Sequence, residues 1–199
     1  MKIVSISEDK NIERRVAITP EIAKKYLSFG FEITISENYG DHLGFKDDEY
    51  KNLGVKISNN NNEILESGDI IVQLNLLSDK NLSSLKEGQI LVGVLNPYEN
   101  MNKIKDLIKK KINNFSLELL PRITRAQSMD ILSSQANLAG YKAVVESFAK
   151  FEKAIPMMMT AAGTVPAAKV LIVGAGVAGL QANTTDKRMR AIVFAKDVR

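Results

Sequence analysis

The sequence predicts an α/β protein with a parallel-sheet, Rossmann-like N-terminal domain, a long bridging helix and the start of a second Rossmann domain. Two observations lead to this fold class. Short β-branched runs alternate with helical segments from Lys2 to Leu119, which is the rhythm of a parallel sheet covered by helices. A glycine-rich turn then follows the apolar run Lys169–Val173 and opens a further helix. That run has the β-branched composition of a strand buried on both faces.

The first domain is expected to contain short strands separated by amphipathic helices. The expected strands are Lys2–Ser7, Phe31–Ser36, Val55–Ser58, Asp69–Leu74, Gln89–Leu95 and Phe115–Leu119. Thr19 and Pro20 are helix-start residues before a helix at Glu21–Phe29. A lysine-rich helix is expected at Glu99–Ile112, and Asn59–Asn62 is expected to be a surface turn.

The carboxyl ends of the expected strands indicate where a ligand would lie. Parallel sheets bind ligands beyond the carboxyl ends of their strands. In this chain we expect those ends to carry Gln73, Asn96 and the loop at Pro121.

Composition excludes several classes of function. With 45% hydrophobic and 25% charged residues over 199 positions, the chain has the composition of a globular protein. It has no cysteine, and we predict no metal site. Its net charge of +4 comes from scattered lysines without a basic stripe, so we expect no nucleic-acid partner. The sole histidine, His42, is expected to be an exposed loop residue.

Two stretches could be taken for export or membrane signals. The start, Met1–Ser7, has the pattern of a strand rather than of a signal peptide. The segment Ala154–Leu180 carries a single charge, but Pro156, Pro166 and its glycines interrupt it. We therefore do not expect it to span a membrane.

The glycine-rich turn has the spacing of a dinucleotide-binding loop. Gly174 would permit the tight turn, Gly176 would let a pyrophosphate approach the backbone, and Gly179 would let the helix pack closely on the strand. Ala175 and Val177 complete the loop, and the helix that starts near Val177 would offer free N–H groups and a positive dipole end. The alternative is that the glycines serve helix packing alone.

An acidic residue follows the next strand, as the dinucleotide-binding motif requires. The strand is expected at Ala191–Ala195, and Asp197 follows Gly179 by 18 residues. A carboxylate about 20 residues after the loop binds the ribose hydroxyls of NAD. An acid there, rather than a base, favours NAD over NADP. Val198 and Arg199 are included with Asp197 as predicted cofactor-binding residues.

A long helix is predicted between the domains, at roughly Ala126–Lys150. Its start carries an almost uncharged polar stripe at three- and four-residue steps: Gln127, Asp130, Ser133, Asn137 and Tyr141. Such a stripe, with Arg122 and Arg125 before it, suits directional hydrogen bonds to a ligand. Two structural explanations remain open: a capping box formed by Thr124 and Gln127, and a polar face lying against a neighbouring domain.

These elements divide the chain into residues 1–125, the helix 126–150 and residues 151–199. The last segment supplies two strands and one helix, which are too few to bury a sheet on both faces. Its helix contains the poor helix formers Asn183–Asp186, and Arg190 stands where a helix-ending glycine is usual.

Three separated motifs resemble the alanine dehydrogenase/pyridine nucleotide transhydrogenase family. They are Glu13-x-Arg15-Val16-Ala17-x-Thr19-Pro20, Arg122-x-x-Arg125-Ala126-Gln127-x-Met129-Asp130 and Gly174-Ala-Gly-Val-Ala-Gly179. The resemblance implies two Rossmann-like domains with the nucleotide between them. It further implies that Arg122, Gln127, Asp130 and Ser133 lie by the nicotinamide and act in catalysis, with Asp197 on the adenosine ribose.

Within the family, the resemblance favours the transhydrogenase branch. The alanine dehydrogenase branch has a substrate-binding lysine where this chain has Gln73 and a catalytic histidine where it has Asn96. Neither amide can act as a general acid or base near neutral pH. Hydride exchange between two nicotinamides needs no such group.

The transhydrogenase branch implies a set of partners and a location. The chain would bind NAD(H) and pass hydride from NADH to oxidised NADP on an NADP(H)-binding partner subunit, while a membrane-embedded subunit translocates protons. A full-length form would be a homodimer, and it would lie in the cytoplasm, held at the inner face of the plasma membrane by its partner. The alternatives are an amino-acid dehydrogenase of the alanine type and a non-catalytic, truncated fragment.

Overall fold

The computed structural model describes residues 1–198 and divides the chain into two compact units. The first unit is Met1–Pro121 and the second is Arg122–Arg199. Each unit is described by itself below.

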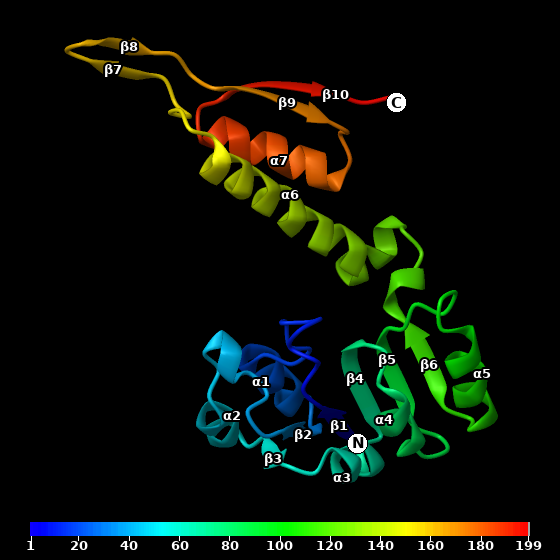
Figure 1. Cartoon of the computed structure of the whole chain (residues 1–199). Coiled ribbons are helices and arrows are strands. Elements are labelled where there is room, and N and C mark those ends of the chain that lie inside the picture. Colours follow the sequence, from blue (N-terminus) through cyan, green and yellow to red (C-terminus); the bar gives the residue numbers. More distant parts are fainter. Residues whose placement is uncertain (199) are drawn as a thin grey trace. The chain divides into compact units, whose positions relative to one another are not determined.

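The first unit is built on a six-stranded parallel sheet (Figure 1). Its strands are β1 (Lys2–Ser5), β2 (Glu32–Ser36), β3 (Lys56–Ser58), β4 (Ile70–Asn75), β5 (Ile90–Val94) and β6 (Asn113–Ser116). They lie in the order β3-β2-β1-β4-β5-β6. The chain therefore leaves the sheet centre in one direction through β2 and β3, and then crosses to β4 and continues in the other. This order confirms the predicted Rossmann-like sheet and places its switch point between β1 and β4.

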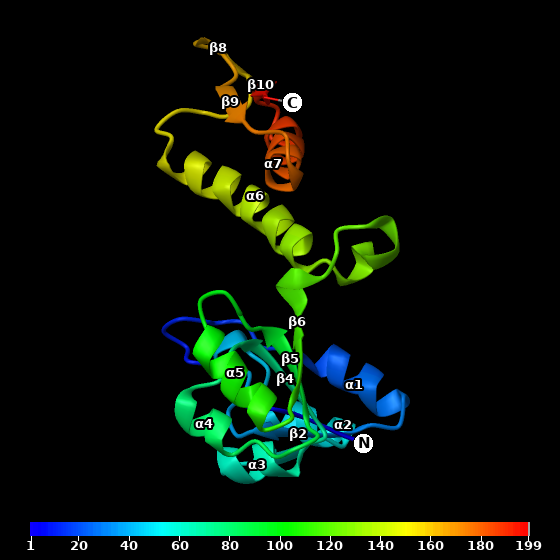
Figure 2. The same ribbon diagram turned by 90° about the vertical axis from the view of Figure 1, so that its right-hand side faces the viewer.

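Helices cover both faces of this sheet (Figure 2). They are α1 (Pro20–Ser28), α2 (Asp47–Leu53), α3 (Asn61–Ser67), α4 (Asp79–Ser83) and α5 (Met101–Lys109). Alternate residues of each strand enter different cores, as the strand period of two requires. Ile3 packs with residues of α1 and α2, whereas its neighbour Val4 packs with residues of α3, α4 and α5.

Two expected elements of the first unit differ from the structure. Asn59–Asn62 is not only a turn, because Asn60 caps α3: its side chain accepts a hydrogen bond from Glu63 N at 3.3 Å. The strand expected at Phe115–Leu119 is β6 instead, and a 3-10 turn, η2 (Leu117–Leu119), follows it.

The second unit contains a long helix, a hairpin and one strand–helix–strand segment. Its elements are the 3-10 segment η3 (Thr124–Met129), α6 (Ile131–Lys150), β7 (Met158–Thr160), β8 (Gly163–Val165), β9 (Lys169–Val173), α7 (Val177–Arg188) and β10 (Ile192–Lys196). The antiparallel hairpin β7–β8 was not expected from the sequence, whereas β9, α7 and β10 were. None of the helices described is both long enough and apolar enough to cross a bilayer.

The long helix begins later than the sequence pattern predicted. It starts at Ile131 rather than Ala126, because Asp130 has an extended backbone and caps the helix with its carboxylate. The capping box of Thr124 and Gln127 is wrong: η3 has Ile123 at its N-cap and no side-chain cap. Gln127 therefore lies in η3, ahead of the helix that carries Ser133.

The small sheet of the second unit has one uncovered face. β9 and β10 pair in parallel, and α7 packs against them with Val170 and Ile172 half-buried. The alternate residues Leu171 and Val173 are 67% and 83% exposed. The prediction that β9 is buried on both faces is wrong for this chain, and the prediction that these elements are too few to cover both faces is confirmed.

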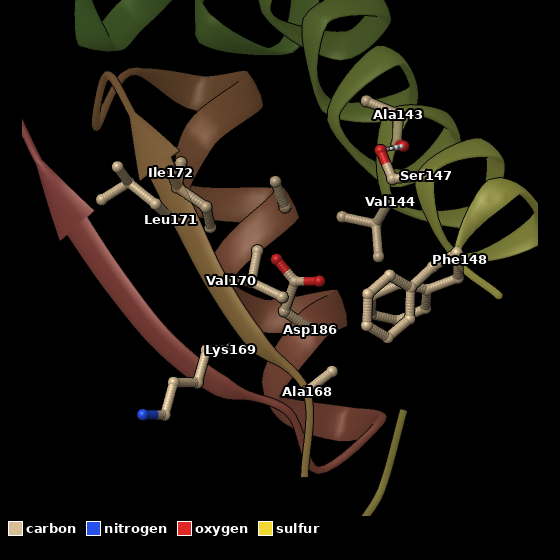
Figure 3. Close-up of a pocket in the computed structure, with 12 residues that line it drawn as sticks. Ala143, Val144, Ser147, Phe148, Ala168, Lys169, Val170, Leu171, Ile172 and Asp186 are labelled. Atoms are coloured by element: carbon tan, nitrogen blue, oxygen red, sulfur yellow. Dashed lines mark hydrogen bonds between the residues drawn. The ribbon is translucent and has the colours of Figure 1, made fainter. Parts of the chain in front are cut away.

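A carboxyl group is buried between α6 and α7. Asp186 of α7 is 1% exposed and lines an apolar pocket of about 400 Å³ with Val144 and Phe148 of α6 and Val170 of β9 (Figure 3). Neither carboxylate oxygen has a hydrogen-bond partner among the described residues. Burial raises the pKa of Asp186 above its ordinary value of 3.8.

We expect Asp186→Ala to stabilise the second unit at neutral pH by about 1–3 kcal/mol, the cost of a buried unpaired polar group. Since the pKa is raised in the folded state, the part of this penalty that is due to ionisation is lost as the pH falls below the ordinary pKa of 3.8, where both states are protonated. It grows as the pH rises toward the folded pKa. Hydrogen exchange of the α7 amides at pH 4 and pH 7 measures the difference.

The exposed acid Glu146 of α6 provides the control within the same unit, because its carboxylate pairs with Lys142 at 2.6 Å on the surface. Glu146→Ala should not stabilise the second unit at neutral pH. Equal protection of wild type and Asp186→Ala at both pH values would contradict the cost assigned to the buried carboxyl.

Candidate functional site

The glycine loop between β9 and α7 has the geometry of a phosphate-binding turn. Gly174 has a φ of +102°, a conformation that residues with a side chain rarely adopt. A Cβ on Gly179 would lie 1.8 Å from the carbonyl oxygen of Gly174, so the helix can pack this closely only without one. Gly176 caps α7 without a side chain, and the space around its Cα is open. The first-turn N–H groups from Val177 onward therefore have no capping side chain over them.

The predicted ribose-binding acid lies beside this loop. Asp197 follows β10, and its Oδ2 accepts a hydrogen bond from Ala175 N at 2.5 Å. Gly174 N donates to the carbonyl oxygen of Lys196 at 2.7 Å, which holds the end of β10 against the loop. Val198 is exposed next to Asp197, whereas Arg199 lies outside the described residues.

The structure brings the predicted nicotinamide residues together around one open pocket of about 730 Å³. Its lining includes Arg122, Gln127, Asp130 and Ser133. Val177, the first residue of α7, lines the same pocket. Hence the end of α7 that follows the glycine loop and the start of α6 meet within the second unit.

Asp130 organises the polar side of this pocket. Its carboxylate accepts hydrogen bonds from Ser133 Oγ at 2.6 Å and from Ser133 N at 2.9 Å. These bonds, with the guanidinium of Arg122 at 3.9 Å, hold the pKa of Asp130 below its ordinary range. The carboxylate is therefore ionised at neutral pH, and it accepts hydrogen bonds rather than supplying a proton.

Several other lining residues were missed or only noted in passing. The pocket is also lined by Ile123, Thr124, Ser134, Asn137 and Leu138. Asn137 belongs to the polar stripe and could have been selected from its spacing of four residues from Ser133. Ser134 shows no such signal, because it follows Ser133 directly in sequence.

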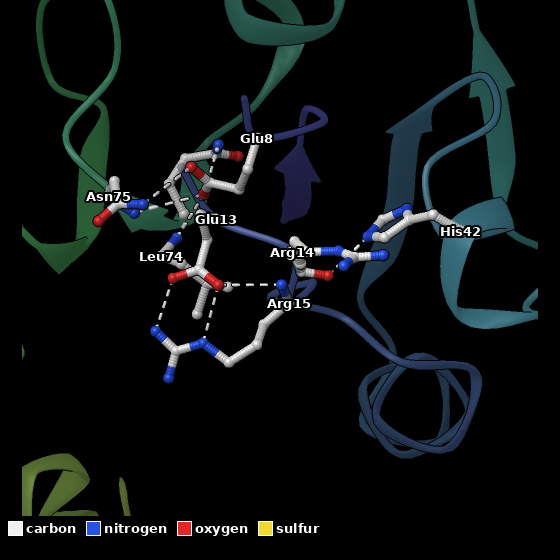
Figure 4. A network of polar contacts seen from close by, with 8 residues as sticks. Glu8, Glu13, Arg14, Arg15, His42, Leu74 and Asn75 are labelled. Atoms are coloured by element: carbon white, nitrogen blue, oxygen red, sulfur yellow. Dashed lines mark hydrogen bonds and ion pairs between the residues drawn. The ribbon is translucent and has the colours of Figure 1, made fainter. Parts of the chain in front are cut away.

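In the first unit, Gln73 serves the structure of the sheet. It is 3% exposed, and its Oε1 accepts from Ser5 Oγ at 2.9 Å and Ile6 N at 2.8 Å. Its Nε2 donates to Glu8 Oε1 at 3.2 Å. The Glu8 carboxylate also accepts from Leu74 N at 2.7 Å (Figure 4), and burial raises its pKa. The amide of Gln73 thus joins β1 to β4.

Two further residues singled out from the sequence lie outside the pocket of the second unit. Asn96 is exposed, with a φ of +45°, and its N–H donates to Glu118 Oε1 at 2.6 Å. His42 is half-buried, so the expectation of an exposed loop residue is wrong. Its Nε2 lies 2.6 Å from the carbonyl oxygen of Arg14 (Figure 4). Because a carbonyl oxygen can only accept, His42 donates this bond and carries its proton on Nε2.

Comparison with protein families assigns both units. The family described as "Alanine dehydrogenase/PNT, N-terminal domain" matches residues 5–139. The chain belongs to the alanine dehydrogenase/PNT family. The description "Alanine dehydrogenase/PNT, C-terminal domain" matches residues 143–199, which contain the glycine loop and Asp197. The resemblance inferred from the three sequence motifs is thereby confirmed.

Two transhydrogenase relatives are more similar to this chain than an alanine dehydrogenase relative is. An NAD(P) transhydrogenase alpha-subunit polypeptide of Rickettsia prowazekii is 48% identical over the whole chain, which covers 53% of that protein. A crystal structure of a transhydrogenase from Sinorhizobium meliloti matches with a TM-score of 0.91 and 43% identity, over 99% of this chain and 59% of that one. An alanine dehydrogenase from Methanococcus maripaludis is 29% identical over 96% of the chain and 52% of its own length. The chain thus spans about half the length of these curated relatives.

Proposed function

We propose that this chain is the NAD(H)-binding portion of a proton-translocating NAD(P) transhydrogenase. The observation that supports this most strongly is the shared pocket, which joins the polar residues near Asp130 to the glycine-loop end of α7 at Val177. A dinucleotide has two corresponding portions, since its pyrophosphate and its nicotinamide are joined through a ribose. The higher identity to a transhydrogenase subunit than to an alanine dehydrogenase supports the same branch.

The residues around the glycine loop fit NAD(H). The open space at Gly176 leaves room for a pyrophosphate against the backbone, and the positive end of α7 would stabilise its charge. Asp197 ends its strand beside the loop, where its carboxylate would accept hydrogen bonds from the adenosine ribose. Arg122, Gln127, Asp130 and Ser133 would orient the nicotinamide. When bound, the cofactor itself supplies the hydride chemistry.

Hydride transfer between two nicotinamides requires position rather than proton handling. The lining of the pocket supplies an ionised Asp130 that is fixed by Ser133 and faces Arg122. These groups would hold a ring in one orientation, which is the contribution of proximity to such a reaction. An amino-acid dehydrogenase would in addition need a general base, and neither the hydrogen-bonded amide of Gln73 nor the amide of Asn96 provides one.

We also propose partner subunits and a cellular location for this chain. NADP(H) would be held by a second subunit, and a membrane-embedded subunit would couple the transfer to proton translocation. The name of the relative from Rickettsia prowazekii describes it as only one piece of an alpha subunit, which supports a division of this activity among separate polypeptides. We propose a homodimer in the cytoplasm, at the inner face of the plasma membrane.

The ribose role of Asp197 gives the first test of cofactor identity. Asp197→Asn should weaken NADH binding by about 1–3 kcal/mol, the size of a hydrogen bond to a charged group lost from the site. Asparagine can still accept the bond from Ala175 N, so the loop should keep its shape. Asp197→Ala should reduce the preference for NADH over NADPH, because the carboxylate that repels the NADP phosphate is gone. Calorimetric titration with both cofactors measures these changes.

Lys196→Ala is the matched control, since only its backbone carbonyl is used to hold the loop. Equal NADH affinity in wild type and both Asp197 variants would rule out the ribose role. Absence of NADH binding by the wild-type chain would instead support the non-catalytic alternative.

A further inference from the structure

We infer that Gly140, in the middle of α6, is a positioning residue that sets the place of the nicotinamide pocket relative to the glycine loop. This inference rests on the proposed function. Gly140 is buried and faces α7. A Cβ at this position would lie 2.1 Å from the carbonyl oxygen of Ala178 and 2.8 Å from its carbonyl carbon. Both are backbone atoms, so no side-chain rotation could relieve the overlap.

The close approach occurs beside the candidate site. Ala178 directly follows Val177, the first residue of α7 and a lining residue of the pocket. On α6, Asn137 and Leu138 line the same pocket and precede Gly140 by less than one helical turn. The contact between Gly140 and Ala178 therefore fixes how far the polar start of α6 lies from the N–H groups of α7.

The sequence position of Gly140 supports a geometric role. Glycine in a helix interior is unfavourable relative to alanine, so local helix stability would favour replacement. An added Cβ would have to move roughly 1.3–1.9 Å further from the carbonyl oxygen of Ala178 to reach an ordinary contact distance of about 3.4–4.0 Å, so the two backbones would separate. The site has two halves, the pocket lining at the start of α6 and the glycine loop with the N–H groups of α7. Each half would remain intact, while the distance between them would change.

The two halves of the site can be probed with two ligands. NADH would engage both the glycine loop and the pocket, whereas ADP-ribose lacks the nicotinamide and would engage the loop and Asp197 alone. We expect Gly140→Ala to lower the affinity for NADH at least about tenfold, and that for ADP-ribose by less than about twofold. Calorimetric titration of the whole chain with each ligand gives this ratio without any catalytic assay.

Val144→Ala provides the control for simple loss of packing. Val144 is one turn further along α6, buried against α7, and its truncation removes apolar contacts without pushing the helices apart. This variant should melt at a lower temperature and keep the wild-type ratio of the two affinities. Loss of packing alone would thus leave the ratio of the NADH and ADP-ribose affinities unchanged.

Different results would contradict the role of Gly140 and the proposed function. If Gly140→Ala leaves the NADH affinity unchanged, or weakens NADH and ADP-ribose equally, Gly140 does not position the two halves and the inference is wrong. If the wild-type chain binds ADP-ribose but shows no gain from the nicotinamide of NADH, the proposed function fails, and the inference fails with it.

Discussion

Replacing Gln127 or Asp130 by alanine should lower the rate of hydride transfer on the order of a hundredfold and lower NADH affinity by much less. Both residues line the pocket at the start of α6. A displacement of the reacting ring by about 1 Å can cost about this factor in rate. Each of these two residues supplies only part of the contacts proposed for the nicotinamide, so NADH affinity should fall less than the rate. The measurement is single-turnover transfer and NADH titration for the chain combined with an NADP(H)-binding transhydrogenase subunit.

The Asp130→Asn variant distinguishes a role of Asp130 in catalysis from its role in capping α6. Asp130 caps α6 through Ser133, and asparagine is an equally good capping residue. Asp130→Asn should therefore melt like wild type but still transfer hydride more slowly, since the charge facing Arg122 is lost. If the alanine variants melt at a lower temperature and transfer hydride at the wild-type rate, the pocket lining is structural and the assignment of these residues is wrong.

Gly179→Ala should weaken NADH binding by at least about 2 kcal/mol, or roughly thirtyfold, through damage to the glycine loop. The new Cβ would lie 1.8 Å from the carbonyl oxygen of Gly174, so the turn or the first turn of α7 must move. Titration with NADH, together with thermal melting, measures both effects.

Gly176→Ala is the informative comparison, because the space around Gly176 is open and its φ of −70° suits alanine. This variant should melt like wild type and still bind NADH more weakly, since the methyl group would occupy the proposed path of the pyrophosphate. Unchanged NADH affinity in Gly176→Ala would place the pyrophosphate elsewhere. Unchanged affinity in Gly179→Ala would show that the loop does not bind the cofactor at all.

Much of the fold could be predicted because its signals are local. The β-branched runs around Ile33 and Ile71 indicated buried central strands, and the glycine spacing indicated the turn before α7. Arg190 has a φ of +60°, so the place where a helix-ending glycine is usual does adopt the left-handed conformation.

Other features of the fold could not be predicted, because the local sequence did not single out one structure. Thr124 and Asp130 are both good capping residues, and only the structure shows that the carboxylate of Asp130 caps α6. The hairpin of β7 and β8 has no typical turn dipeptide, and its strands are three residues each, so no strand pattern could be recognised.

The candidate site could be predicted only in part, because some of its contacts are local and others are not. The spacing of Asp130, Ser133 and Asn137 was visible because a helix repeats about every 3.6 residues. The role of Gly140 was not visible, because its neighbour Ala178 is distant in sequence and the contact forms only when α6 packs on α7. The burial of Asp186 likewise arises from tertiary packing.

The most direct test of the proposed function is hydride transfer between the two cofactors. The chain is mixed with NADH deuterated at C4, and an NADP(H)-binding transhydrogenase subunit carrying oxidised NADP is added. After a single turnover the reaction is quenched, and deuterated NADPH is separated and quantified, because NADH and NADPH absorb alike. The account predicts NADP reduction that requires both polypeptides, is independent of any amino acid, and is slowed by Asp130→Asn. Reduction of NAD by the chain alone in the presence of alanine, or NADH binding without any transfer to the partner, would contradict it.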